Sequence, residues 1–165
     1  MKELKKVLVV EDNPSHLRDA VAYLQSQGLE VITATNASDG ADAMRRLHEW
    51  KHTVEEILVD GVISDVFMPL SKPTEWNRKF QHSNDPCGLI LMREGNRCGI
   101  PHVLCTDGYH HGAKLQWIFD FCHADNDHWF MADASESVKD GQAEHKDWAK
   151  ALEILRRCAA ETEDK

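Results

Sequence analysis

Apolar residues along this chain fall into two alternating patterns. Short runs of consecutive apolar residues, rich in Val, Ile and Leu, are typical of buried strands. Stretches with apolar residues three and four positions apart are typical of helices that cover a sheet. The two patterns alternate through the first two thirds of the 165 residues. The predicted strands lie at residues 7–10, at 29–33, in a run that ends at 65, at 102–106 and at 129–131.

The helix boundaries carry signals of their own. Asn13 followed by Pro14 is typical of an N-cap with proline at the first helical position. Gly28 is typical of the residue that ends such a helix. Ser38 is predicted to cap the second helix, which the pattern extends to residue 48. Further helices are predicted at residues 87–93, 115–121 and 148–158.

Strands that alternate with helices predict an α/β fold with a doubly wound, five-stranded parallel sheet between two layers of helices. A chain of this length is expected to form a single domain, here residues 1–165 with a core at about 5–158. The few residues after 160 are too short for an output domain, so we expect none.

Residues 70–85 do not fit the alternation. They are polar and follow the third predicted strand and its turn directly. Loops longer than about 12–15 residues in compact domains tend to be functional or disordered. Two interpretations remain open: a mobile surface insertion, or a lid or partner-binding loop anchored by Trp76 and Phe80.

Carboxylates follow two of the predicted strands. Glu11 and Asp12 come directly after the first strand, and Asp65 ends the third. Open α/β sheets place their ligand crevices at the carboxyl ends of strands, so these three side chains are expected to converge there. Gathered carboxylates repel one another unless a cation neutralises them, and Mg²⁺ favours carboxylate oxygens. The sequence therefore predicts a magnesium site.

Three segments together resemble the receiver domain of bacterial response regulators, the phosphoacceptor half of two-component signalling. They are residues 9–13 with the acidic pair, 65–69 with the sequence Asp-Val-Phe-Met-Pro, and 103–106 with a terminal threonine. The resemblance covers nearly the whole chain and is strongest over its first 69 residues. It implies a flavodoxin-like, three-layer receiver fold with strand order 2-1-3-4-5.

The resemblance also implies the roles of individual residues. Asp65 would be the phosphorylated nucleophile. Glu11, Asp12, Asp65 and the main-chain carbonyl of Phe67 would hold Mg²⁺. Thr106 would be the switch hydroxyl that bonds a phosphate oxygen.

The last third departs from the receiver pattern. Receivers normally place a lysine at the end of the fifth strand, where its ammonium pairs with the aspartate or the phosphate, and none stands there in this chain. Lys139 could reach back from the following loop, since lysine has a long flexible stem. Lys72, Arg78 or Lys79 from residues 70–85 could substitute for it.

Other positions carry weaker predictions. Trp129 is the expected aromatic switch residue, with Phe130 as the other candidate, and each could equally be a core ring. Asp107 is a charged residue where receivers commonly have a small one. Asp60, at the opposite end of the third strand from Asp65, is expected to be a solvated turn residue.

The resemblance implies a Mg²⁺-dependent phosphoacceptor rather than a conventional enzyme. Its partners would be a sensor histidine kinase or a histidine phosphotransfer protein, and a downstream protein target. The alternative is a pseudo-receiver, a protein-binding module without efficient phosphorylation because the lysine is missing. A haloacid-dehalogenase-like phosphatase is disfavoured, because that family has a second Asp where Phe67 stands.

Charge and composition agree with this prediction. A net charge of −9 argues against a nucleic-acid or anionic-membrane surface. No apolar run approaches the ~20 residues that span a bilayer. The five cysteines form no Cys-x-x-Cys pair, which favours free thiols in a reducing cytoplasm.

Overall fold

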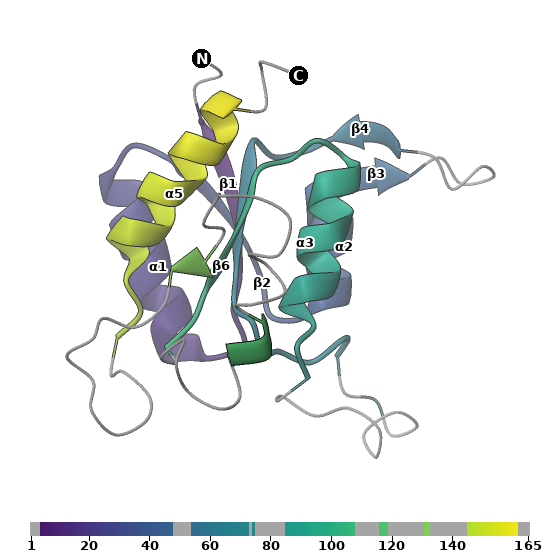
Figure 1. The fold of residues 1–165 in the computed structure, drawn as a ribbon, viewed down its shortest axis with the longest axis horizontal. Coiled ribbons are helices and arrows are strands. Elements are labelled where there is room, and N and C mark those ends of the chain that lie inside the picture. Colours follow the sequence, from purple (N-terminus) through teal and green to yellow (C-terminus); the bar gives the residue numbers. More distant parts are fainter. Residues whose placement is uncertain are drawn as a thin grey trace.

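The fold is centred on a five-stranded sheet in which every strand pair is parallel. The structure is a computed structural model that describes residues 4–47, 54–72, 74, 85–107, 116–118, 131–132 and 145–161. Figure 1 shows the strands side by side at the centre of the molecule. Their order across the sheet is β2 (Glu30–Ala34), β1 (Lys6–Val10), β5 (Gly61–Ser64), β6 (His102–Cys105) and β7 (Met131–Ala132). This order confirms the predicted doubly wound sheet.

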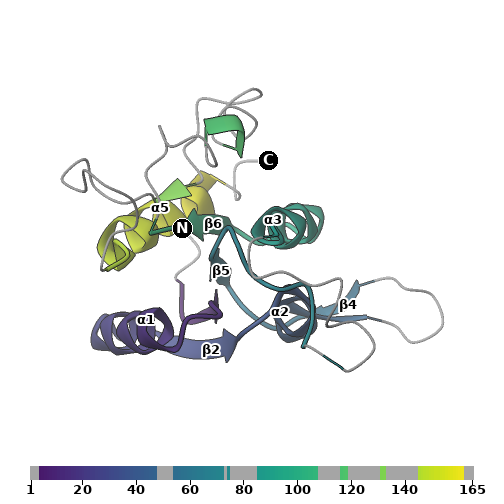
Figure 2. The same cartoon turned by 90° about the horizontal axis from the view of Figure 1, so that it is seen from below.

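Helices cover both faces of the sheet, as Figure 2 shows. One face carries α1 (Pro14–Ser26) and α5 (Trp148–Glu161), and the other carries α2 (Ala37–Met44) and α3 (Gly88–Arg97). Alternate residues of β1 serve the two layers: Val7 and Val9 pack with α1 and α5, whereas Leu8 and Val10 pack with α2 and α3. The three-layer arrangement therefore follows from the period of two in a strand.

The first helix begins and ends where the sequence predicts. The Asn13 side chain accepts a hydrogen bond from the Ser15 N–H, and Pro14 opens the helix. Gly28 lies just beyond the end of the helix with φ of +81°, a conformation that glycine adopts without a steric penalty. These are the capping roles expected from the residue types.

The second helix differs from the prediction at both ends. Asn36, not Ser38, is the cap, because its side chain accepts the N–H of Asp39. The helix stops at Met44 and does not extend to residue 48. The chain instead forms a two-stranded antiparallel ribbon, β3 (Arg45–Leu47) with β4 (Val54–Ile57), at one side of the molecule (Figure 1).

The apolar run before Asp65 is thus divided between two elements. Its first residue, Ile57, ends β4, and the sheet strand β5 begins only at Gly61. The α3 helix is longer than predicted and ends just before Cys98 and Gly99, which has φ of +65°. Residues 116–118 are helical, and Ala151, Leu152 and Leu155 of α5 are buried as predicted.

Two bulk predictions concern the cysteines and the absence of membrane-spanning helices in the described part of the chain. Its cysteines, at 87, 98, 105 and 158, are free thiols. Among these residues, no helix combines the length and the apolar character needed to cross a membrane.

Candidate metal and phosphoacceptor site

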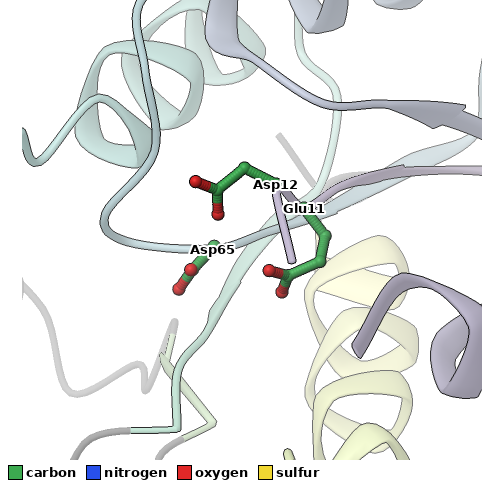
Figure 3. Close-up of side chains that lie close together, drawn as sticks. All are labelled: Glu11, Asp12 and Asp65. Carbon is green, nitrogen blue, oxygen red and sulfur yellow. The ribbon is translucent and has the colours of Figure 1, made fainter. Parts of the chain in front are cut away.

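The pairing of β1 with β5 brings the three acidic residues together. Val10 and Ser64 are register partners, so Glu11 and Asp65, one residue further along, leave adjacent strands at the same edge. The Asp65 N–H donates to the Val10 carbonyl at 2.8 Å. Ligand oxygens of Glu11, Asp12 and Asp65 lie within 4.8 Å of one another (Figure 3). The predicted convergence of these side chains is confirmed.

Backbone amides fix two of these carboxylates. One Glu11 oxygen, Oε1, accepts the N–H of Asn13 at 3.0 Å, and Asp65 Oδ1 accepts the N–H of Val66 at 2.7 Å. The Glu11 side chain is buried. Its orientation is therefore set by the turn that follows β1 rather than by solvent.

A lysine that sequence reasoning missed completes the cluster. Lys146 is buried, and its Nζ lies 2.5 Å from Glu11 Oε2 and 2.9 Å from Asp65 Oδ1. It stands two residues before α5. The candidate that the sequence suggested, Lys139, lies outside the described residues. Lys146 has the position with respect to Asp65 that the receiver resemblance expects of a lysine.

The sequence does contain a signal for Lys146. Asp147 caps the last helix, since its Oδ1 accepts the N–H of Lys150 at 2.9 Å. Lys146 comes directly before this cap. The lysine can be found from its position two residues before the last helix. Its distance from the fifth strand does not identify it, because residues 133–145 lie between them.

The charges of the cluster do not balance without a further cation. Three carboxylates and one ammonium sum to −3 + 1 = −2 when all four groups are ionised. A divalent ion would cancel this charge, and a hard ion such as Mg²⁺ favours carboxylate oxygens. Both the donor set and the charge therefore fit Mg²⁺.

Burial and charge shift the pKa values of these groups. Burial raises the pKa of Asp65 to about 6, although the Lys146 ammonium opposes the shift. Burial, followed by the negative charge of Asp65, raises the pKa of Asp12. Burial alone would lower the pKa of Lys146, but the carboxylates of Asp65 and Glu11 outweigh it and raise that pKa. The two carboxylates therefore favour the charged form of Lys146.

The other predicted site residues have different outcomes. Thr106 is buried just after β6, and its N–H donates to the Ala132 carbonyl at 2.9 Å, which places it at the same edge of the sheet. Phe67 is half-buried and packs against the apolar cluster of Leu104. Its predicted role as a carbonyl ligand stays a prediction. Trp129 lies outside the described residues.

Asp107 and Asp60 can both be placed. Asp107 is near enough to the cluster for its charge to contribute to the raised pKa of Asp12. Asp60 is more than a solvated turn residue, because its Oδ2 accepts the N–H groups of Lys5 at 3.0 Å and Lys6 at 2.9 Å. It ties the amino ends of β1 and β5 together, away from the site.

Residues 70–85 begin and end close to Asp65. Met68 forms an isolated parallel bridge with Pro86, and its N–H donates to the Asp85 carbonyl at 3.1 Å. Lys72 forms an ion pair with Asp39 at 2.9 Å. Most of the segment, including Arg78 and Lys79, lies outside the described residues.

Gly88, the first residue of α3, lies directly against the main chain of Asp65. A Cβ atom there would come within 2.0 Å of the Asp65 carbonyl oxygen. The Gly88 N–H also donates to the Val66 carbonyl at 3.0 Å. A glycine at this point lets α3 start immediately behind the acidic site.

No protein-family model matches the chain, and no curated protein matches it in sequence. Solved structures do match it in fold. A response regulator receiver domain protein (CheY-like) from Methanospirillum hungatei JF-1 is 18% identical, with a TM-score of 0.56 over 98% of this chain and 98% of that one. The signal receiver domain of an HD domain-containing protein from Pseudomonas fluorescens Pf-5 is 15% identical, with a TM-score of 0.58 over 99% and 93%.

A third match carries a metal. The receiver domain of a sensor histidine kinase from Pseudomonas aeruginosa PAO1 was solved with a magnesium ion coordinated in its active site cleft. It is 16% identical, with a TM-score of 0.53 over 96% of this chain and 99% of that one. These likenesses show that the chain has the receiver fold, the flavodoxin-like three-layer sandwich.

Proposed function

We propose that this chain is a Mg²⁺-dependent phosphoacceptor of a two-component phosphorelay, phosphorylated on Asp65. The observation that carries the proposal is the convergence of Glu11, Asp12, Asp65 and Lys146 at one edge of a receiver-fold sheet. A receiver fold alone would leave the function open, because one fold hosts many functions. The site is what supports the phosphoryl chemistry.

Asp65 supplies the nucleophile. One of its carboxylate oxygens forms a bond to phosphorus as the bond between phosphorus and the donor breaks, and the donor atom leaves with that electron pair. The Val66 N–H and the Lys146 ammonium both contact Oδ1 of Asp65. They would hold the carboxylate in place during the transfer.

Lys146 and Thr106 serve the transferred group. The Lys146 ammonium offsets negative charge as the phosphoryl group arrives, which is the main electrostatic demand of this reaction. Thr106, at the same edge, would donate a hydrogen bond to a phosphate oxygen. This second contact is how a local change of charge would become a change at the protein surface.

Asp12, Asp65 and Glu11 would hold Mg²⁺, with the Phe67 carbonyl as a further ligand. The bound ion would neutralise charge on the phosphate oxygens. Of the three carboxylates, Glu11 has both oxygens already engaged, one by the Asn13 N–H and one by Lys146. Asp12 and Asp65 are therefore the direct ligands we expect, with Glu11 contributing through its charge or through water.

The donor would be a sensor histidine kinase or a histidine phosphotransfer protein, and the output would be contact with a downstream protein. The pseudo-receiver alternative depended on a missing lysine. Lys146 supplies a buried ammonium 2.9 Å from Asp65 Oδ1, so that reason no longer favours it.

The test is phosphorylation by a small-molecule donor. The protein is incubated with acetyl phosphate and Mg²⁺, and its intact mass is measured over time. We expect the mass to rise by one phosphoryl group, and to do so only when Mg²⁺ is present. Asp65→Asn should abolish the gain, while Asp60→Asn, the same change at the opposite end of β5, should retain it.

Two results would contradict the proposed function or the proposed phosphorylation site. If neither acetyl phosphate nor a phosphorylated histidine phosphotransfer protein adds mass to the folded wild-type chain, the phosphoacceptor proposal is wrong. Equal labelling of the Asp65→Asn variant would show that the modified residue is a different one.

A further inference from the structure

An aromatic ring lies beside the buried ammonium. Trp148 is the first residue of α5, two positions after Lys146, and it is only 7% exposed. The Lys146 Nζ lies 5.9 Å from the centroid of its ring. A cation at this distance from an indole face is attracted by the quadrupole of the ring. Lys146 thus has acids as partners and an aromatic ring as a further neighbour.

The choice of tryptophan is not explained by packing alone. Its indole Nε1–H is buried and finds no acceptor among the described residues. A buried donor without a partner is destabilising. Phenylalanine would fill much of the same space without a polar atom, but its face attracts a cation less strongly than the indole face does.

The connection between Lys146 and Trp148 is short and fixed. The Trp148 N–H donates to the Lys146 carbonyl at 3.1 Å, and the Asp147 cap holds the first turn of α5. The ring is packed in the core cluster that α1 and α5 share with the sheet. The indole ring is therefore held in place by packing, and the lysine side chain can lie against it.

We propose that Trp148 is a positioning residue that holds the Lys146 ammonium against Glu11 and Asp65. The part of this inference that concerns the phosphorylation rate rests on the proposed phosphoacceptor function. Trp148 acts through Lys146 and touches neither phosphate nor metal.

Holding Lys146 in place has two opposite consequences. It favours phosphoryl transfer, because a fixed ammonium needs no reorganisation when charge arrives. It also disfavours the binding of a divalent cation, because the ammonium occupies Glu11 Oε2 and repels a second positive charge. A looser lysine should therefore slow phosphorylation while it strengthens Mg²⁺ binding.

The experiment compares Trp148→Phe and Trp148→Leu with the wild-type chain. Three quantities are measured: Mg²⁺ affinity by titration calorimetry, the phosphorylation rate with acetyl phosphate at saturating Mg²⁺, and the midpoint of urea unfolding. The free energy of a cation–π contact corresponds to a change of roughly 2- to 30-fold in an equilibrium constant or a rate. A phenylalanine ring keeps part of this contact.

For Trp148→Phe we expect a rate about 2- to 5-fold slower and a Mg²⁺ affinity about 2- to 5-fold higher, within that cation–π range. The midpoint of urea unfolding should change little, because the smaller ring loses some packing but also removes a donor that has no acceptor among the described residues. Trp148→Leu should move rate and affinity further in the same directions. The control is Trp117→Phe, the same chemical change at a half-exposed indole, which should alter none of the three.

Two results would overturn the inference. Unchanged rate and affinity in both variants would show that the ring does not act on Lys146. A parallel loss of rate, metal affinity and stability would show a purely structural role. If the wild-type chain takes up no phosphoryl group, the proposed function fails, while the Mg²⁺ titration still decides whether Trp148 restrains the lysine.

Discussion

An aspartate flanks each end of the strand β5, and the two aspartates have different environments. At the amino end, Asp60 accepts hydrogen bonds from the backbone N–H groups of Lys5 and Lys6, which joins β1 to β5. At the carboxyl end, Asp65 lies among Glu11, Asp12 and Lys146. Asp60 stabilises the fold, whereas Asp65 carries the chemistry that we propose.

Each end of the sheet also has a lysine–glutamate pair. Lys6 and Glu30 are 2.9 Å apart with side chains 36% and 63% exposed, whereas Lys146 and Glu11 are buried almost completely. Solvent screens the first pair, so its contribution to stability is small. The second pair is unscreened, and removing one partner leaves a buried charge. The position in the parallel sheet, more than the residue type, decides what these groups do.

The sharpest way to break this comparison is to remove each lysine in turn. Lys146→Met leaves the carboxylates of Glu11 and Asp65 without their ammonium, and we expect the free energy of unfolding to fall by roughly 3–5 kcal/mol. Lys6→Met should cost under about 1 kcal/mol. Urea unfolding of the metal-free proteins measures both.

Mg²⁺ provides a second readout for the same pair of variants. Because the ion would neutralise the cluster that Lys146 leaves, added Mg²⁺ should restore part of the stability of Lys146→Met and leave the effect of Lys6→Met unchanged. Equal losses in the two variants would mean that the two ends of the sheet do not differ electrostatically.

The second prediction concerns pH. The pKa of Asp65 is raised from 3.8 to about 6 in the folded protein. Between these values the folded state binds more protons than the unfolded state, so ionising Asp65 lowers the free energy of unfolding as the pH rises from 4 to 6, by at most about 3 kcal/mol.

Asp65→Asn removes this titration. The difference in unfolding free energy between Asp65→Asn and the wild-type chain should therefore grow in favour of the variant from pH 4 to pH 6, and then level off. Asp60→Asn serves as the control at the other end of β5. A difference for Asp65→Asn that stays constant across this range would contradict the raised pKa.

The third prediction compares two glycines, one near each end of the sheet. Gly88→Ala places a Cβ atom 2.0 Å from the Asp65 carbonyl oxygen, so α3 must shift, at a cost of roughly 2–3 kcal/mol. Gly99→Ala meets no atom within 4 Å and suffers only from its φ of +65°, a cost of roughly 1 kcal/mol. Thermal unfolding ranks the two, and the shift of α3 should also reduce Mg²⁺ binding in Gly88→Ala alone.

The last prediction concerns Asp60. Asp60→Ala removes the acceptor for two backbone N–H groups at a partly exposed position, which should lower the free energy of unfolding by roughly 1–2 kcal/mol. Phosphorylation of Asp65 should continue at the wild-type rate. A loss of phosphorylation in a variant that remains folded would show that the two ends of β5 are coupled.

The sequence was sufficient to predict the sheet and the convergence of its acids. The strand signals at β1 and β5 are strong because both faces of these strands are buried, which produces continuous apolar runs. Once parallel pairing is assumed, Glu11 and Asp65 must leave the sheet at the same edge. Local patterns are enough for this part of the site.

The parts that local patterns missed depend on distant contacts. Asn36 and Ser38 are both residue types that cap helices well. The choice between them depends on the main chain at Pro69, because the Pro69 carbonyl accepts the Ala37 N–H. The β3–β4 ribbon depends on pairing across residues 48–53. Lys146 was missed because it is separated from Ala132 by a stretch that has no counterpart in the expected spacing.

The pairing of Met68 with Asp85 and Pro86 has a practical consequence. It brings the two ends of the intervening segment together just beyond Asp65, so the entropic cost of lengthening that segment grows only slowly with the number of residues. A peptide epitope or a small reporter domain grafted there would leave the sheet and its acids in register.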